Sequence, residues 1–253
     1  MALTEKLAAI ANAIRSKTGK TEGLTLEQMP GEIEGIETGG VSEQEIIDKL
    51  ASNVFPSGDI VVNSALQHSA FFRKSKITSV HVIGSMRASE GAFAFCAGLK
   101  KAVIEKSDTG FAINTFNSCT ALEHVVFRPV QTGRSMFSSC TALKRFEGGS
   151  DFERVYGDGA FYKCTALKYI ILRKKTTMQM TSCFSTTSIS SGGTGCNIYV
   201  PSALIEEQRA ETNWAVFDAY GTITWKALED YTIDGTTTGE MDWAKIEAEE
   251  VTA

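Results

Sequence analysis

The sequence lacks the features that mark several large classes of proteins. No segment approaches the roughly 20 consecutive apolar residues of a transmembrane helix, so we expect no membrane insertion. The 25 Lys and Arg are outnumbered by 30 Asp and Glu, and this net charge of −5 argues against binding to nucleic acid. The N-terminal stretch MALTEKLAAIANAIRSKTG is charged from Glu5 onward and has no apolar core of a signal peptide. We therefore expect no signal peptide and synthesis in the cytoplasm.

The residue patterns of common catalytic and metal sites are also missing. There is no Cys-x-x-Cys, and the three histidines, His68, His81 and His124, show no spacing typical of a metal site. The glycine-rich stretch SSGGTG lacks the lysine of a phosphate-binding loop. No Ser-His-Asp or Cys-His arrangement can be inferred. The sequence therefore predicts no catalytic residue, no metal site and no cofactor, and we expect that the protein is not an enzyme.

One motif is present in several copies. The sequence Phe-x-x-Cys-Thr-Ala-Leu occurs three times, and alignment on its phenylalanine reveals six copies at intervals of 21 to 24 residues. The copies begin at Phe71, Phe93, Phe116, Phe137, Phe161 and Phe184. The cysteines of the inner copies are Cys96, Cys119, Cys140 and Cys164. The two end copies differ, with Lys74 and Thr187 at the cysteine position, as expected of terminal repeats that cap a stack.

Each copy up to the fifth ends in a short alternation of outward and apolar residues, such as Val125 and Phe127 in the third. A period of two indicates a strand with one buried face. One short strand in every turn of 20 to 29 residues is typical of a leucine-rich-repeat solenoid, whose stacked turns share one core. The fold class that we predict is an α/β repeat: a β-rich leucine-rich-repeat solenoid with a short helical N-terminal segment and a C-terminal cap.

The pattern Phe-x-x-Cys-x-x-Leu-x-x-Val-x-Ile resembles the BspA-like leucine-rich repeats of bacteria and their viruses, over roughly residues 66–190. In such a stack, the repeated cysteines would form an internal ladder. Adjacent strands lie about 4.8 Å apart, which is within reach of a disulfide, but equivalent side chains point the same way and disfavour its dihedral angle. We therefore interpret the cysteines as buried packing groups rather than as disulfides or metal ligands.

The segments outside the repeats are expected to form four further units. Residues 1–40 contain an amphipathic helix whose apolar side chains would mediate assembly. These side chains are Leu3, Leu7, Ile10 and Ile14. The other units are a linker helix with an N-terminal cap (41–65), a C-terminal cap (191–229) and an acidic tail (230–253) that is mobile or engages a neighbour. Residues 1–40 resemble the attachment segments of phage and prophage tail or fibre proteins, and 191–229 resembles the segment that closes such repeats.

The outer face of the predicted sheet is the candidate binding site. If the residues six and eight positions after each cysteine are buried, those at five and seven point outward. The residues of this binding face are His81, Lys101, Val103, His124, Val126, Arg145, Tyr169 and Ile171. Two valines on adjacent strands, flanked by charged and aromatic residues, favour an interaction surface. The alternative is that a terminal arm or the aromatic closing segment covers them.

These observations favour a structural protein of a phage tail, baseplate or fibre that displays a leucine-rich-repeat module. The expected partners are other virion proteins, a receptor on the bacterial surface (protein or glycan), and further copies of this chain, for which the resemblance suggests a trimer. The expected location is the virion, after assembly in the host cytoplasm. The alternatives are a bacterial surface or host-interaction protein with the same repeats, and a structural spacer without a ligand.

Overall fold

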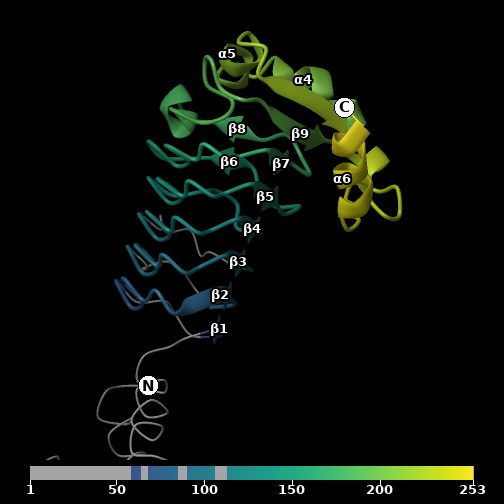
Figure 1. Ribbon diagram of the computed structural model, residues 1–253. Helices are drawn as coiled ribbons and strands as arrows, with labels where there is room; N and C mark the ends of the chain where they lie inside the picture. Colours follow the sequence, from purple (N-terminus) through teal and green to yellow (C-terminus); the bar gives the residue numbers. More distant parts are fainter. Residues whose placement is uncertain (1–57, 64–67, 85–89, 106–112, 253) are drawn as a thin grey trace, which may run out of the picture. The chain divides into compact units, whose positions relative to one another are not determined.

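A computed structural model describes residues 58–63, 68–84, 90–105 and 113–252, which belong to one compact unit. Within these residues, eight parallel strands form one sheet along the side of a solenoid, which confirms the predicted fold class (Figure 1). In spatial order the strands are β1 (Gly58–Val62), β2 (Ile77–Val82), β3 (Lys101–Ile104), β4 (His124–Phe127), β5 (Arg145–Gly148), β7 (Tyr169–Ile171), β9 (Cys196–Val200) and β10 (Ile223–Ala227).

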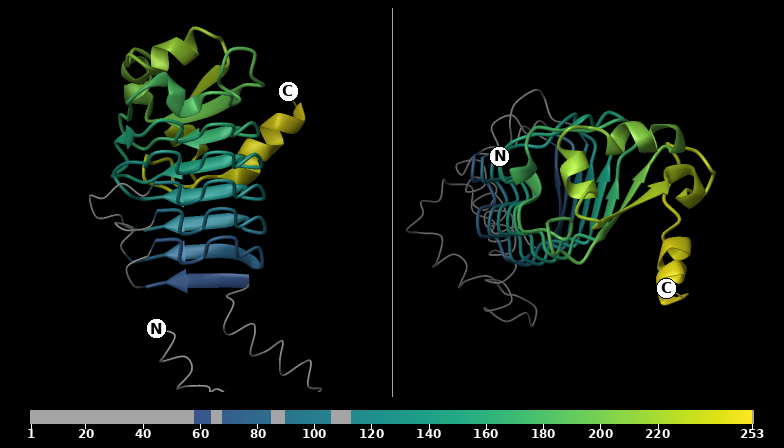
Figure 2. Two further views of the ribbon diagram at one scale, coloured as in Figure 1. Left: turned by 90° about the vertical axis from the view of Figure 1, so that its left-hand side faces the viewer. Right: turned by 90° about the horizontal axis from the view of Figure 1, so that it is seen from above.

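The register of this sheet places equivalent repeat positions side by side. His124 of β4, for example, lies between Lys101 of β3 and Arg145 of β5. A second, two-stranded parallel sheet, β6 (Arg154–Val155) with β8 (Thr177–Met178), lies elsewhere on the solenoid wall. Figure 2 shows the turns stacked one upon another, so that a single core runs along the stack.

A column of stacked phenylalanine rings runs through this core. The six phenylalanines that begin the copies lie with ring centroids 4.8 to 5.6 Å apart and interplanar angles of at most 20°. The five from Phe93 to Phe184 are buried. A contact between aromatic rings contributes about 0.5–1.5 kcal/mol beyond the burial of area. The repeat of the motif is thus explained, because each turn supplies one ring to the column.

The cysteine ladder lies beside this column and is sealed from solvent. Cys96, Cys119, Cys140 and Cys164 are all fully buried, and none forms a disulfide. Each thiol donates a hydrogen bond to the carbonyl oxygen of the phenylalanine one copy earlier, with an S···O distance of 3.1 Å. Burial raises the pKa of Cys96 to about 11 and that of Cys119 well above its ordinary value. The cysteines are therefore packing groups, as predicted, with a hydrogen bond that the sequence did not reveal.

In β5 the repeat pattern is interrupted by Gly148, which stands where other copies have a large apolar residue. The ring of Phe152 fills the vacant space: a Cβ atom on Gly148 would lie 2.7 Å from Phe152 Cδ1. Phe152 is fully buried and contacts both Phe127 and Phe146. The core therefore remains continuous across the copy that looks weakest in the sequence.

The sheet extends beyond the repeat region 66–190 at both ends. Strand β1 lies within residues 41–65, which we had assigned to a linker helix and cap, and β9 and β10 belong to the C-terminal cap. The cap also contains η2 (Ser202–Leu204), α4 (Ile205–Arg209) and α5 (Trp214–Asp218), whereas η1 (Thr181–Phe184) lies in the last copy of the repeat. Trp214 and Phe217 are buried against Phe184 and close the phenylalanine column, whereas the nearby Tyr220 is exposed.

Residues 230–253 were expected to be mobile or to engage a neighbour, and their described part, up to residue 252, instead packs on the sheet of the chain itself. After η3 (Leu228–Tyr231), the chain folds back and forms α6 (Trp243–Thr252) beside β5, β7 and β9 (Figure 1). The physical reason is a second hydrophobic cluster on the outer side of the sheet. It contains Tyr169, Ile171, Tyr199, Leu228, Tyr231, Met241 and Ile246. The segment is acidic, but it carries enough apolar side chains to bury that part of the sheet.

Candidate functional site

The outer face of the sheet consists of two rows of side chains, which follow from the parallel register. One row is Asp59, Ser79, Lys101, His124, Arg145, Tyr169 and Asn197. The other row is Val61, His81, Val103, Val126, Glu147, Ile171 and Tyr199. The residues between these positions, such as Val125 and Ile170, belong to the core cluster inside the solenoid. All eight residues of the predicted binding face therefore point away from that core.

Two of these eight residues are not available to a ligand. Tyr169 is 4% exposed and Ile171 is fully buried, because the C-terminal segment covers β7. Their assignment to the binding face was wrong because a terminal arm covers this part of the face; the two valines, for which the sequence left such a cover open, stay half-buried. We call the part over β5, β7 and β9 the covered half of the outer face, and the part over β1 to β4 the open half.

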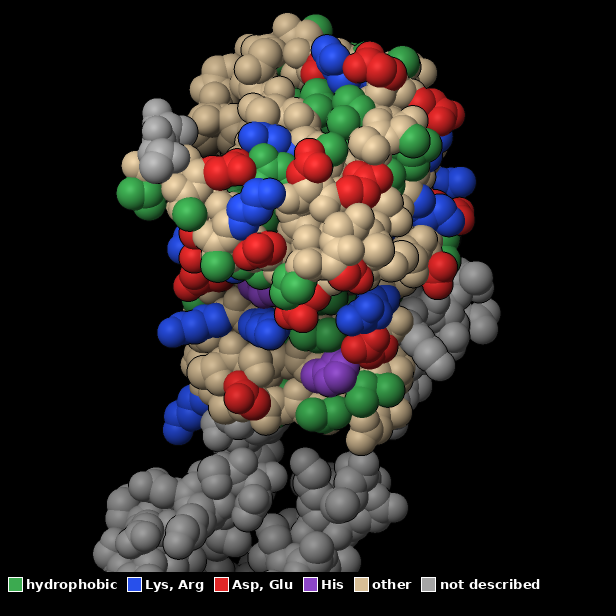
Figure 3. Space-filling model, turned by 90° about the vertical axis from the view of Figure 1, so that its right-hand side faces the viewer, with side chains coloured by type: hydrophobic (Ala, Val, Ile, Leu, Met, Phe, Trp, Pro, Cys, Tyr) green, Lys and Arg blue, Asp and Glu red, His purple; other side chains and the backbone are tan. Residues whose placement is uncertain are grey.

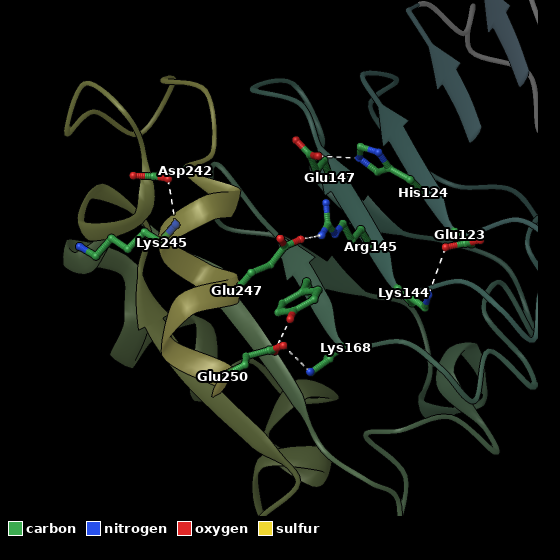
Figure 4. A network of polar contacts seen from close by, with 11 residues as sticks. Glu123, His124, Lys144, Arg145, Glu147, Lys168, Asp242, Lys245, Glu247 and Glu250 are labelled. Carbon is green, nitrogen blue, oxygen red and sulfur yellow. Dashed lines mark hydrogen bonds and ion pairs between the residues drawn. The ribbon is translucent and has the colours of Figure 1, made fainter. Parts of the chain in front are cut away.

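Carboxylates of α6 hold this helix on the covered half (Figure 4). Glu247 pairs with Arg145, and Glu250 pairs with Lys168 at 2.6 Å and accepts a hydrogen bond from the hydroxyl of Tyr169. The guanidinium of Arg145 also lies 4.1 Å from the centre of the Trp243 ring. Arg145 is thus half-buried between a carboxylate and an aromatic ring, so it too serves an internal contact.

Apolar and ionic groups alternate on the open half. Val61 is 58% exposed, and Val103 and Val126 follow it in the same row, both half-buried. Beside them, His81 and Arg128 both pair with Glu105, at 2.9 and 2.8 Å. Nε2 of His124 lies 2.6 Å from Glu147. On the side of the molecule shown in Figure 3, acidic and basic side chains alternate, and no large area carries one sign of charge.

Comparison with known families gives a single result. Residues 53–157 and 89–200 match the family described as BspA type Leucine rich repeat region, with 6 copies. Together the two matches extend over more than half of the 253 residues. The chain belongs to this family. No curated protein matches the sequence.

The leucine-rich-repeat module indicates a role in protein–protein interaction, since solenoids of this kind typically act as non-enzymatic scaffolds that bind through extended faces. Within the described residues, no group of three or more His, Cys, Asp or Glu could hold a metal ion. No helix of the described part is long and apolar enough to cross a membrane. The residues of the expected assembly helix, Leu3, Leu7, Ile10 and Ile14, lie outside the described residues.

Sequence reasoning missed several polar residues at the edge of the leucine-rich-repeat sheet. Glu105, Arg128 and Arg173 all stand nine positions after their cysteine, just beyond the strand. The period of two defines rows only within the strands, and this third row lies beyond them; its constant spacing from the cysteines is the signal that identifies it. Trp243 was missed because nothing in the repeat pattern points to the C-terminal segment. It contacts His124, Arg145 and Tyr169.

Proposed function

We propose that this protein is a structural component of a phage tail, baseplate or fibre, and that the open half of its outer face binds a host receptor or a neighbouring subunit. The setting rests on residues 1–40, which resemble phage attachment segments. The binding role rests on the row Val61, Val103 and Val126, which remains accessible while the same row further along is buried.

The binding proposal rests on the comparison between the covered half, where the outward row is buried by a peptide segment, and the open half, where it is accessible. In the covered half, the outward row binds a complementary polypeptide segment, α6, through apolar contacts flanked by ion pairs. The open half offers the same combination: valines with Lys101 and His124 beside them. Exposed apolar side chains in a row are characteristic of interaction surfaces. A partner that covers Val103 and Val126 would extend the arrangement that the chain already makes with itself.

The test is a double substitution, Val103→Lys with Val126→Lys, in particles that carry the protein. Tyr169, also a residue of the predicted binding face, is unsuitable for substitution because it is buried. We expect loss of particle adsorption or of subunit contact, with an unchanged melting transition. Val216→Lys, at a 38% exposed position on α5, is the matched control. Normal adsorption and assembly by a well-folded double variant would reject the open half as the binding surface.

Assembly through residues 1–40 is the second part of the proposal. An apolar stripe of Leu3, Leu7, Ile10 and Ile14 would need a partner, which favours a homo-oligomer, with a trimer as the form suggested by phage fibres. Light scattering of the whole chain should give a multiple of the mass of a shortened protein that begins at Ser42. Equal, monomeric masses for both proteins, together with equal entry into particles, would contradict this role.

The runner-up function is a bacterial surface or host-interaction protein of the same repeat class. It would use the same open half, so the double substitution does not separate the two settings. Fractionation does: the phage proposal expects the protein in purified particles, and the alternative expects it on the bacterial surface. A protein in either location whose double variant behaves normally would point to a spacer without a ligand.

A further inference from the structure

A cleft lies between the outer face of the sheet and the segment 238–243 that leads into α6. Its volume is about 580 Å³, within the roughly 300–1,000 Å³ of sites for small ligands. His124, Val126 and Glu147 contribute to its sheet side, and Trp243 lies on the opposite side. The cleft therefore sits at the border between the open and the covered half, where the chain itself forms both walls.

Three cationic side chains line this cleft, and each has N–H groups that are not used in hydrogen bonds within the described residues. Arg128 uses Nε for Glu105, at 2.8 Å, and Arg173 uses Nη1 for the carbonyl oxygen of Thr237, at 2.7 Å. Their remaining N–H groups have no hydrogen-bond partner among the described residues, and neither has the ammonium of Lys101. Guanidinium groups with a free edge suit the planar, bidentate geometry of a carboxylate.

A glycine stands between the two arginines on one edge of the sheet. Arg128, Gly149 and Arg173 occupy the same position, nine residues after their cysteines, in three successive turns. A Cβ atom on Gly149 would lie 3.0 Å from Cα of Arg128 and 3.3 Å from its Cβ and Cγ. A side chain at 149 would thus crowd the stem of Arg128 and fill the floor between the arginines. The glycine leaves a hollow there, with one arginine on each side.

The rest of the lining points to a ligand with hydroxyl groups as well as a negative charge. Ser150 and Thr238 line the cleft, and so do the carboxylates of Glu147 and Glu240. Carboxylates would repel a ligand that is charged along its whole length, such as a nucleic acid, but they accept hydrogen bonds from sugar hydroxyls. Trp243 and Val126 add apolar surface beside them, against which the C–H groups of a sugar ring can pack.

We propose that this cleft binds an acidic saccharide, one that carries a carboxylate on a sugar ring. Arg128 and Arg173 hold the carboxylate with help from Lys101, and the acidic and hydroxyl side chains hold the ring hydroxyls. The covered half shows the same chemistry inside the chain, since Glu247 and Glu250 pair with Arg145 and Lys168. The inference deepens the proposed binding role of the outer face and rests on it, because it names the chemistry of the receptor.

The experiment is calorimetric titration of the whole purified chain with two acidic oligosaccharides, each beside a neutral counterpart. An oligosaccharide with a single galacturonate ring is compared with its methyl ester, and sialyllactose with the methyl ester of its sialic acid, so that ring and hydroxyls are retained while the charge is removed. We expect at least one acidic member to bind at least tenfold more tightly than its neutral counterpart, since a hydrogen bond to a charged group is worth about 1.5–3 kcal/mol. Lys101→Gln and Arg128→Gln should each weaken that binding about tenfold or more for the same reason.

Lys100→Gln is the matched control, because Lys100 is exposed, adjacent in sequence, and does not line the cleft. Melting temperatures of all variants establish that they are folded. Failure of both acidic sugars to bind, equal binding of the neutral forms, or unchanged binding by folded Arg128→Gln would overturn the inference. Displacement of the sugar by inorganic phosphate at equal concentration would also overturn it, in favour of a simple anion site.

The titration tests the saccharide and the adsorption experiment tests the binding role of the face, so a negative result in one does not imply a negative result in the other. The titration uses isolated protein and changes only cations of the cleft, whereas adsorption depends on Val103 and Val126 in particles. If no sugar binds but the double valine variant loses adsorption, the saccharide is wrong and the binding role of the face stands. If the sugar binds but that variant adsorbs normally, the proposed role in adsorption is wrong.

Discussion

The open and covered halves of the outer sheet face use the same repeat positions but have opposite environments. Val126 on β4 and Ile171 on β7 occupy the same row, with Glu147 of β5 between them. Val126 is half-buried and lines a cleft, whereas Ile171 is fully buried in a hydrophobic cluster. β4 and β7 are parallel strands of the same type of repeat, so the repeat itself does not explain the different environments. The difference arises because the C-terminal segment packs on one half only.

An outward position in a solenoid is therefore not by itself a surface position. The stack of turns fixes which side chains point away from the core, since the period of a strand is two. Whether such a side chain meets solvent depends on a further layer of the chain. Here α6 is that layer, and its boundary near Trp243 is also where the candidate cleft forms.

The largest expected effect is on stability, and it should differ between two truncations, one in each half of the outer face. Ile171→Ala should lower the free energy of unfolding by about 2–5 kcal/mol, because it leaves a cavity in a buried cluster. Val126→Ala should cost only about 0.5–1 kcal/mol, because its side chain is half-exposed. Urea denaturation of both variants gives the two values. Equal losses would mean that the two halves are equally covered in solution.

A second prediction tests whether the interior beneath the two halves is alike. Cys119→Ser and Cys164→Ser should each cost about 1–3 kcal/mol, since each places a hydroxyl in an apolar core. The carbonyl that accepts the thiol's hydrogen bond at 3.1 Å remains as a partner and keeps the loss within this range. In the native protein, both thiols should resist labelling until urea unfolds the chain. Rapid native labelling of Cys119 alone would show that the open half exposes its core.

A third prediction concerns the aromatic contact at the boundary between the halves. Trp243→Ala should destabilise the protein by about 1–2 kcal/mol, because it removes the ring that lies 4.1 Å from the Arg145 guanidinium. Tyr220→Ala, at a 47% exposed position, is the control and should be nearly neutral. Thermal unfolding compares the two variants. A neutral Trp243→Ala would indicate that α6 contributes little to holding the covered half closed.

The smallest expected effect is a dependence of α6 docking on pH. Partial burial would raise the pKa of Glu250, but its contacts with Lys168 and Tyr169 outweigh this and hold it below the ordinary value of 4.5. The stabilisation is therefore complete above pH 4.5 and is lost as the pH falls through the lowered pKa of the folded protein. Its size should be below about 1 kcal/mol, as for most exposed ion pairs.

The readout for this prediction is the fluorescence of Trp243, obtained as the difference between the native protein and Trp243→Phe. The signal should change only below pH 4.5, and Glu250→Gln should weaken that change. A transition centred above pH 4.5, or one that Glu250→Gln leaves intact, would contradict the role given to this carboxylate.

Much of the fold could be predicted because the repeat encodes it locally. Each turn places phenylalanine, cysteine and leucine at the same positions, and only a stack of turns can bury all of them at once. The exception at Gly148 could not be predicted, since Phe152 fills its space from outside the motif. The hydrogen bond from each thiol to the preceding turn was likewise invisible, because it depends on the distance between backbone and side chain in the stack.

The candidate site could be predicted only in part. The spacing of the motif identified the rows that include Lys101, His124 and Val126, and the structure places them on the outer face as expected. The cleft between them and Trp243 requires a second wall, and no pattern in the sequence indicates which segment supplies it. Arg128 and Arg173 line one cleft because equivalent positions of successive turns stack, with Gly149 between them.

The sequence by itself thus determined the solenoid, the period of its turns and the direction of each strand side chain, because these follow from local periodicity and from burial that every turn repeats. Only the tertiary structure decided which outward residues remain accessible. That choice rests on contacts between residues far apart in the chain, such as Arg145 with Glu247, 102 positions later, and Tyr169 with Glu250, 81 positions later. No local pattern specifies such a pairing, because it depends on where the returning chain finds both apolar surface and opposite charge.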